Sequence, residues 1–169
     1  MPRDLTEVLG RLLTDAALRT ELRRDAAAVA ARLDVSSEAL SGLDLDGLEV
    51  QAEELLGKRG HEVEKLLPRT WTGLGSRAPV IFRIHAATVW PEGHHRHLDD
   101  ALAFASFLEY ERYPRCRAEF RRLRFSASRK SWSVGVVPDA LVRGVSRRAV
   151  QLLYRRNGEV RSLAFTMGL

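Results

Sequence analysis

Three histidines and two carboxylates fall within seven residues near the middle of the chain, where they could bind a metal ion. His94, His95 and His97 precede Asp99 and Asp100. Imidazole and carboxylate groups bind zinc and iron, and ligands on one helix need a spacing of three or four residues. Only the first and third histidines have that spacing, and the proline and glycine before them predict a turn that enters a helix. We therefore predict no metal site within this chain, and leave open a site shared with a partner.

No other set of residues completes a catalytic site. Cys116 lies between Arg115 and Arg117, whose charges favour a thiolate, but no histidine stands near it in the sequence. It is the one cysteine, so it forms no disulfide within the chain and is expected to be a plain thiol. The sequence has no Gly-x-Ser-x-Gly elbow, no P-loop and no complete dinucleotide fingerprint. We expect a binding or accessory protein that is not an enzyme and holds no cofactor of its own.

Charge is distributed unevenly along the 169 residues. The net charge is +5, but residues 112–169 contain 14 Lys and Arg against Glu119, Asp139 and Glu159. The remaining residues carry 13 Lys and Arg against 19 carboxylates. A strongly basic segment attracts anionic ligands such as nucleic acid, an acidic protein or an acidic peptide. A solvated basic surface without a ligand is the other interpretation.

The elements that would position these residues begin with helices. Apolar residues recur at steps of three and four near the N-terminus, as in Leu5, Val8 and Leu12. Asp25 can cap a short alanine-rich helix, and Asp46 with Glu49 has the spacing of a capping box. The expected helices cover residues 5–13, 18–22, 26–31, 46–67, 79–89 and 98–108, with a glycine-containing loop at 70–75.

The last third of the chain shows alternation typical of strands. Residues 121–126 and 131–137 are expected to be strands, with Trp132 facing the core. Asn157-Gly158 predicts a two-residue type I′ hairpin. Its register would pair Arg156 with Glu159, Tyr154 with Arg161, Leu152 with Leu163 and Val150 with Phe165. The predicted fold class is α+β: an N-terminal helical bundle, residues 1–112, followed by a basic antiparallel sheet of three to four strands, residues 113–169.

Several short segments of the helical part resemble one family. They are Leu13-Thr14-Asp15-Ala16-Ala17-Leu18-Arg19, Asp25, Leu43-Asp44, Leu55-Leu56-Gly57-Lys58-Arg59 and Leu66-Leu67-Pro68-Arg69-Thr70-Trp71. This pattern is similar to accessory proteins encoded beside multinuclear non-haem iron enzymes that oxidatively modify ribosomally made peptides. The resemblance implies a heterodimer in which the helical part docks on the iron enzyme and the sheet holds the leader of the precursor peptide. The iron would belong to the partner enzyme.

The resemblance and the charge pattern together name candidate residues. Leader peptides of this kind are often acidic, and a basic sheet edge could add a peptide strand. The expected peptide-binding residues are Arg121, Arg122, Arg124, Tyr154, Arg155, Arg156 and Arg161. The expected partner-docking residues are Lys58, Arg59, Trp71 and Trp90.

The alternative is a nucleic-acid-binding module that uses the same basic sheet. Phe120, Phe125, Trp132 and Tyr154 lie among its basic residues and could stack on bases. These aromatic residues occupy the alternating positions that we expect to face the core, and no recognition-helix or RNA-module signature is present, so we prefer the accessory protein. No apolar run is long enough to span a membrane, and the N-terminal segment is amphipathic, so a cytoplasmic protein is expected.

Overall fold

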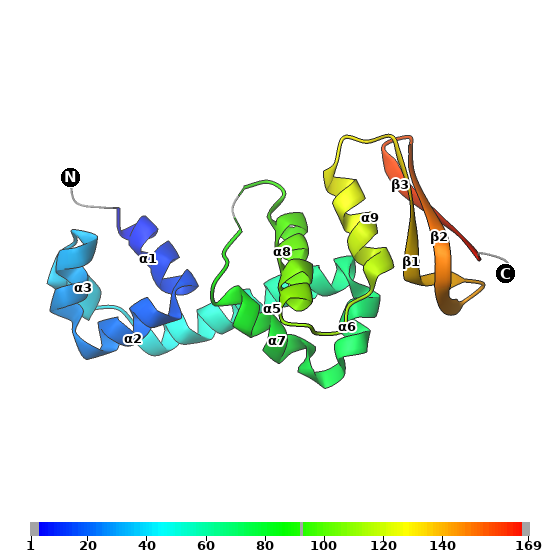
Figure 1. Ribbon diagram of the computed structural model, residues 1–169. Helices are drawn as coiled ribbons and strands as arrows, with labels where there is room; N and C mark the ends of the chain where they lie inside the picture. Colours follow the sequence, from blue (N-terminus) through cyan, green and yellow to red (C-terminus); the bar gives the residue numbers. More distant parts are fainter. Residues whose placement is uncertain (1–3, 92, 167–169) are drawn as a thin grey trace. The chain divides into compact units, whose positions relative to one another are not determined.

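The computed structural model describes residues 4–91 and 93–166, in which helices come first and strands last (Figure 1). The helices are α1 (Leu5–Thr14), α2 (Ala16–Arg24), α3 (Ala26–Leu33), α4 (Ser37–Ser41), α5 (Leu45–Leu66), α6 (Pro68–Leu74), the 3₁₀ turn η1 (Gly75–Arg77), α7 (Ala78–Ala86), α8 (Arg96–Tyr110) and α9 (Arg117–Ala127). The strands are β1 (Trp132–Val142), β2 (Val145–Arg156) and β3 (Glu159–Thr166). The predicted α+β class is confirmed.

The chain divides into two compact units. The first comprises Met1–Arg59 and Ala86–Trp90, and the second comprises Gly60–His85 and Pro91–Leu169. The division falls within α5, so the longest helix contributes residues to both units. The domains predicted from the sequence, a helical partner-docking domain at residues 1–112 and a basic β domain at residues 113–169, stay a prediction.

Aspartates begin the short helices of the first unit. The carboxylate of Asp15 accepts a hydrogen bond from the backbone N–H of Leu18, and that of Asp25 accepts one from Ala28, both at 2.9 Å. Each bond satisfies a backbone donor that has no partner within its own helix. The predicted cap at Asp25 is therefore confirmed.

The residue that caps the start of α5 differs from the predicted one. The helix begins at Leu45, and Asp44 accepts a hydrogen bond from the backbone N–H of Gly47 at 3.0 Å. The predicted capping box at Asp46 and Glu49 is wrong. Both of these carboxylates instead pair with arginines of α2, which the local sequence could not reveal.

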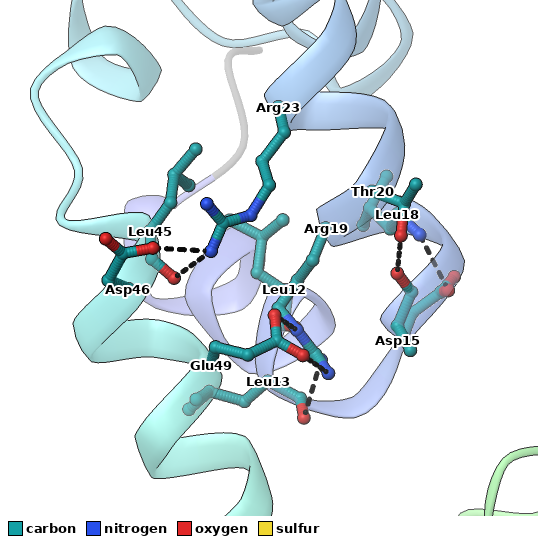
Figure 2. A network of polar contacts seen from close by, with 11 residues as sticks. Leu12, Leu13, Asp15, Leu18, Arg19, Thr20, Arg23, Leu45, Asp46 and Glu49 are labelled. Carbon is teal, nitrogen blue, oxygen red and sulfur yellow. Dashed lines mark hydrogen bonds and ion pairs between the residues drawn. The ribbon is translucent and has the colours of Figure 1, made fainter.

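A buried arginine joins α2 to α1 and α5 in the first unit (Figure 2). Arg19 is 5% exposed, and its Nη1 donates to the carbonyl oxygen of Leu12 at 2.7 Å. Its Nε and Nη2 donate to the two carboxylate oxygens of Glu49 at 3.0 and 3.3 Å. On the same helix Arg23 pairs with Asp46 at 2.8 Å. Around this network the core of the unit is apolar and includes Val8, Leu12, Leu18, Leu22, Val29, Leu33 and Leu40.

Aromatic rings form the core of the second unit. Phe82 of α7 and Phe104 of α8 meet edge to face with their ring centres 5.4 Å apart, and Trp71 of α6 lies 6.0 Å from Phe82. His85 and Asp100 are also buried there, with Nε2 of the histidine 3.5 Å from Oδ1 of the aspartate.

Residues 70–75 are not the predicted loop. They continue α6 and begin η1, and Pro68 stands at the first turn of α6, where a proline costs no hydrogen bond. The N-terminus of α6 is capped from a distant part of the chain. The carboxylate of Glu119 in α9 accepts hydrogen bonds from the backbone N–H groups of Arg69 and Thr70 at 2.7 and 2.9 Å. This tertiary cap explains why glycine-containing sequence can form a helix here.

The sheet is antiparallel with the strand order β1-β2-β3. The predicted Asn157-Gly158 hairpin is confirmed, because Arg156 pairs with Glu159, Tyr154 with Arg161, Leu152 with Leu163 and Val150 with Phe165. Asn157 and Gly158 have φ values of 52° and 80°, which a type I′ turn requires. A second tight turn at Arg143 and Gly144, with φ values of 51° and 78°, joins β1 to β2.

The predicted strand at residues 121–126 is wrong, because these residues belong to helix α9. Over six residues, alternating arginines with Leu123 and Phe125 fit a strand as well as a helix. The signal that begins the helix lies elsewhere in the sequence. The carboxylate of Asp139 in β1 accepts hydrogen bonds from the backbone N–H groups of Arg117 and Ala118 at 2.6 and 2.9 Å.

Helix α9 covers one face of the sheet, and this decides which strand residues are buried (Figure 1). The covered face carries Gly135, Val137, Ala149 and Leu153. Trp132, predicted to face the core, is 67% exposed, and that prediction is wrong. The side of the sheet away from α9 also carries large apolar side chains, and these are exposed. We call this opposite side the open face, defined by Trp132, Val134, Val136, Leu152, Leu163 and Phe165.

Candidate functional site

Two of the seven predicted peptide-binding residues hold the sheet and α9 together. Arg121 lies in α9 above the covered face, and its Nη1 donates to the backbone oxygen and Oε1 of Gln151 at 2.9 and 3.2 Å. Its Nη2 donates to Oγ of Ser133 at 2.7 Å. Partial burial lowers the pKa of Arg121 from its ordinary value, a desolvation effect that leaves the guanidinium charged at neutral pH.

Arg155 ties the connection between α9 and β1 to strand β2. Its Nη2 donates to the backbone oxygens of Phe125, Ser126 and Ser128 at 3.1, 2.9 and 2.6 Å, and its Nε donates to that of Lys130 at 3.2 Å. The last turn of a helix leaves carbonyl groups without partners, and a guanidinium with several donors satisfies them. The primary role of Arg155 in this structure is therefore structural.

The other five predicted peptide-binding residues lie on two sides of the sheet. Tyr154, Arg156 and Arg161 line one hollow near the Asn157-Gly158 turn. Arg122 lines a second hollow with Arg161, beside β3. Arg124 lies across α9 from these residues, beside β1. The structure therefore does not bring all seven residues into one site.

A basic groove runs between α9 and the edge strand β1. Its lining includes Arg115, Arg117, Phe120, Arg121, Arg124 and Lys130, together with Val136, Val137 and Pro138 of β1. We call it the β1 groove. The guanidinium groups of Arg115 and Arg124 lie 4.5 and 5.7 Å from the centre of the Phe120 ring, within the range of a cation–π contact. The basic character of this segment follows from the sequence. Arg115, Arg117 and Lys130 were not among the predicted binding residues, and they line the groove because residues 117–127 form a helix and not a strand.

Strand β1 presents an edge to this groove. It is the first strand in the order β1-β2-β3, so one side of its backbone has no neighbouring strand among the described residues. An unpaired edge exposes N–H and C=O groups that can pair with another extended chain. The regular part of the strand runs from Trp132 to Val137 and ends at an irregularity between Val137 and Ala140 that contains Pro138. The usable edge is therefore about six residues long.

Most arginines in the described part of the basic segment form no ion pair. Glu119 and Asp139 accept hydrogen bonds from helix N-termini, as described above, and Glu159 pairs with Arg161 at 2.5 Å. Within residues 112–166, the ion pairs are this one and that between Arg115 and Glu109. Three carboxylates against 14 Lys and Arg in residues 112–169 leave this surface strongly positive.

The four predicted partner-docking residues are divided between the two units. In the first unit Nη2 of Arg59, which is 9% exposed, donates to the backbone oxygen of Val89 at 2.9 Å, and the guanidinium lies 4.4 Å from the centre of the Trp90 ring. Lys58 is exposed, and its Nζ lies 3.8 Å from Oε2 of Glu54. In the second unit Trp71 packs against Phe82 in the aromatic core. Trp90, at 38% exposed, is the aromatic residue of this set best placed to contact a partner.

Neither the cysteine nor the histidines assemble a reactive centre. Cys116 is buried, and desolvation raises the pKa of its thiol above the ordinary value, which keeps the thiol protonated at neutral pH. His94 and His95 lie in the turn before α8, and His97 is in its first turn. In the part of the chain that the structure describes, no three His, Cys, Asp or Glu residues are grouped to hold a metal ion.

Among the described helices, none is long and apolar enough to cross a membrane. No curated protein and no solved structure matches the chain. One family model matches residues 23–110, slightly more than half of the chain, from the end of α2 to the end of α8. The matched region stops before α9 and the sheet. The chain therefore belongs to the family described as SCO6045-like, C-terminal domain.

Proposed function

We propose that this chain is a non-catalytic accessory subunit that holds an acidic precursor peptide for an iron-dependent oxidative enzyme. The observation that carries the proposal is the β1 groove, in which a free strand edge lies beside basic side chains of α9. The enzyme partner is suggested by the resemblance of the helical segments to accessory proteins of such enzymes. The complex would be a cytoplasmic heterodimer with the iron in the partner.

An extended peptide would bind by adding a strand to β1. Backbone hydrogen bonds along Trp132–Val137 would hold the peptide without regard to its sequence, and its side chains would point alternately to the two faces. On the side of α9, acidic side chains would meet Arg117 and Arg124, whereas Arg115 is already paired with Glu109. Pro138 has no N–H to donate, so pairing would stop there. The groove therefore selects an extended, acidic segment of about six residues.

The partnership can be tested by co-expressing the chain with the genes beside its own. Affinity purification followed by metal analysis should recover an iron-containing protein in a fixed ratio, together with a peptide substrate. A protein that purifies alone and free of iron under these conditions would contradict the enzyme partnership. The same preparation supplies the peptide for the groove test.

The groove itself is tested with charge-reversal variants of the full chain. Arg117→Glu with Arg124→Glu should weaken binding of the co-purified peptide about tenfold or more at moderate salt. The control is Arg143→Glu with Arg147→Glu, which changes the net charge equally at exposed positions of the other hairpin. Equal losses in both variants would show a diffuse charge effect, and undiminished binding in the first would reject the groove.

A nucleic-acid-binding module is the second candidate function. Trp132 and Tyr154 are cross-strand neighbours on the open face, and Tyr154 is followed by two arginines. Trp132 is exposed on this face and is therefore able to stack on a base. Binding of a single-stranded oligonucleotide that falls steeply with salt, with loss in Trp132→Ala, would favour this candidate.

A further inference from the structure

The open face is an apolar surface on a sheet that has a helix on its other side only. Trp132, Val134, Val136, Leu163 and Phe165 are between 45% and 67% exposed. Exposed apolar groups this large and this close together are uncommon on a protein that acts alone, and they mark interaction sites. Within the second unit, the described helix that packs on the sheet is α9, and it occupies the covered face (Figure 1).

The residues of the open face form regular rows across the three strands. Val134 pairs with Leu152, which pairs with Leu163, and in the next row Val136 and Phe165 both pair with Val150. A third row places Trp132 opposite Tyr154 and Tyr154 opposite Arg161. The surface is therefore apolar over two rows and half of the third.

The dimensions of the open face fit one α-helix. Three strands spaced about 4.8 Å apart would span about 10 Å in a flat sheet. Cα atoms of β1 and β3 come within 8 Å of each other, so the face is no wider than one helix with its side chains. Neighbouring rows lie two strand residues apart, so the three rows extend about 14 Å along the strands. This is the length of about nine residues of an α-helix. The 11-residue helix α9 covers the other face of the same sheet, so a helix of similar length would complete the second layer.

The rim of the open face is mainly basic. Alternate residues of β2 face the same side, so Arg148 and Arg156 lie on the open face, one before and one after the apolar residues of β2. On β3, Arg161 lies on the same face, opposite Tyr154. Glu159 is the acidic residue at this rim among the described positions, and it pairs with Arg161. Charge complementarity therefore favours an occupant with acidic residues on either side of an apolar stripe.

We propose that the open face docks an amphipathic helix with acidic flanks that belongs to a partner protein. The helix would place its apolar stripe across Val134, Leu152 and Leu163, and its carboxylates would meet Arg148, Arg156 and Arg161. This surface lies on a face of the sheet and the β1 groove lies along its edge, and the two share Val136.

Other occupants fit the observations less well. A second copy of the chain would bring two basic rims together, and like charges at an interface are unfavourable. A nucleic acid would contact the basic rim but would leave the two aliphatic rows without complementary groups.

The test uses a designed helix as the probe. A fluorescein-labelled peptide of about 18 residues carries leucines at positions i, i+3, i+4 and i+7 with glutamates on both flanks, and a second peptide replaces the glutamates with lysines. Fluorescence anisotropy with the full chain should show saturable binding of the first peptide and at least about tenfold weaker binding of the second. No binding of the glutamate peptide at millimolar protein would overturn the proposal.

Matched variants locate the binding. Leu163→Gln with Phe165→Gln removes two residues of the open face that are 45% and 54% exposed, and should weaken binding about tenfold. The control, Val80→Gln with Ile84→Gln, removes residues of α7 that are 58% and 55% exposed, and should change binding less than about twofold. Circular dichroism establishes that both variants are folded. Equal effects of the two variants would overturn the proposal.

Three further measurements decide between occupants. Sedimentation with vesicles of phosphatidylserine and phosphatidylcholine, titration with a single-stranded oligonucleotide, and analytical ultracentrifugation of the chain alone should each give the same result for the wild type and for Leu163→Gln with Phe165→Gln. If vesicle binding, oligonucleotide binding or self-association is instead lost in that variant, the open face has a different occupant and the proposal is wrong. These outcomes leave the β1 groove unaffected, because the two substituted residues lie on β3.

Discussion

Individual arginines in this protein differ in function according to what their guanidinium groups contact. Arg155 binds four backbone oxygens, Arg121 spans two strands, and Arg19 is buried against a carbonyl and a carboxylate. Arg117 and Arg124, in contrast, line an open groove. A substitution of an arginine in this chain therefore affects either stability or binding, and the structure separates the two groups.

Removal of Arg155 should destabilise the protein strongly. Arg155→Met leaves the oxygens of Phe125, Ser126, Ser128 and Lys130 without this donor. We expect a loss of about 2–4 kcal/mol in the free energy of unfolding, measured by urea denaturation. The control Arg156→Met changes an exposed neighbour and should cost less than about 0.5 kcal/mol. Similar losses in both variants would contradict the structural role assigned to Arg155.

The ion pair between Arg19 and Glu49 should make stability depend on pH. The hydrogen bond from Arg19 lowers the pKa of Glu49 below its ordinary value of 4.5. A carboxyl whose pKa is lower in the folded state stabilises the fold above its unfolded pKa, and this contribution disappears as the pH falls through the folded pKa. Glu49→Gln should therefore cost stability at pH 7 and little at pH 3.

The expected cost at pH 7 is about 0.5–1 kcal/mol, because the side chain of Glu49 is half exposed and solvent screens the pair. Urea denaturation of the wild type and Glu49→Gln at both pH values measures it. Glu38→Gln, at an exposed position of α4, is the control and should have no effect at either pH. A cost that is the same at pH 3 and pH 7 would show that the charge of Glu49 is not responsible.

At the scale of elements, α9 organises the second unit. It receives its N-terminal cap from Asp139 of β1 and supplies the cap of α6 through Glu119. It also covers one face of the sheet and forms one wall of the β1 groove. The position of this helix therefore decides which face of the sheet is buried and which strand edge is basic.

The contact between α9 and β1 depends on a glycine. A Cβ atom at Gly135 would lie 2.9 Å from Nε of Arg121, so Gly135→Ala must displace a guanidinium that has three hydrogen bonds. We expect a destabilisation of about 1–2 kcal/mol by thermal or urea unfolding. Gly57→Ala in α5, where no atom lies within 4 Å of the new Cβ, should stabilise by about 0.5–1 kcal/mol. A stabilising Gly135→Ala would show that Arg121 does not lie over this glycine.

At the scale of the whole molecule, the uneven charge should be visible in the response to salt. Residues 112–169 contain 14 Lys and Arg, and the described part of this segment makes two ion pairs. Repulsion between these like charges is screened by salt. Raising NaCl from about 0.02 to 0.5 M should raise Tm by about 2–4 °C, measured by circular dichroism.

The salt effect has its own control within the basic segment. Arg143→Ser with Arg147→Ser and Arg148→Ser removes three positive charges at exposed positions, so its Tm should rise less with salt. A Tm that falls with salt in the wild type would show that ion pairs contribute more than repulsion. Such a result would also weaken the argument for an anionic ligand.

Local signals in the sequence were sufficient for the fold class and for part of the sheet. Asn157-Gly158 requires positive φ at two adjacent positions, so its turn and the register of β2 with β3 follow from neighbouring residues alone. The cap at Asp25 is equally local, since donor and acceptor are three residues apart. The basic character of the last third is a property of composition and needs no structure.

The tertiary structure alone decided which residues form the candidate site. Residues 121–126 belong to a helix whose N-terminus is capped by Asp139 of β1, and no local pattern contains that information. Trp132 is exposed because α9 packs on the face that carries Gly135. Alternation in a strand shows that its two faces differ, but which face is buried depends on the element that packs against it. The β1 groove and the open face both follow from that one packing choice.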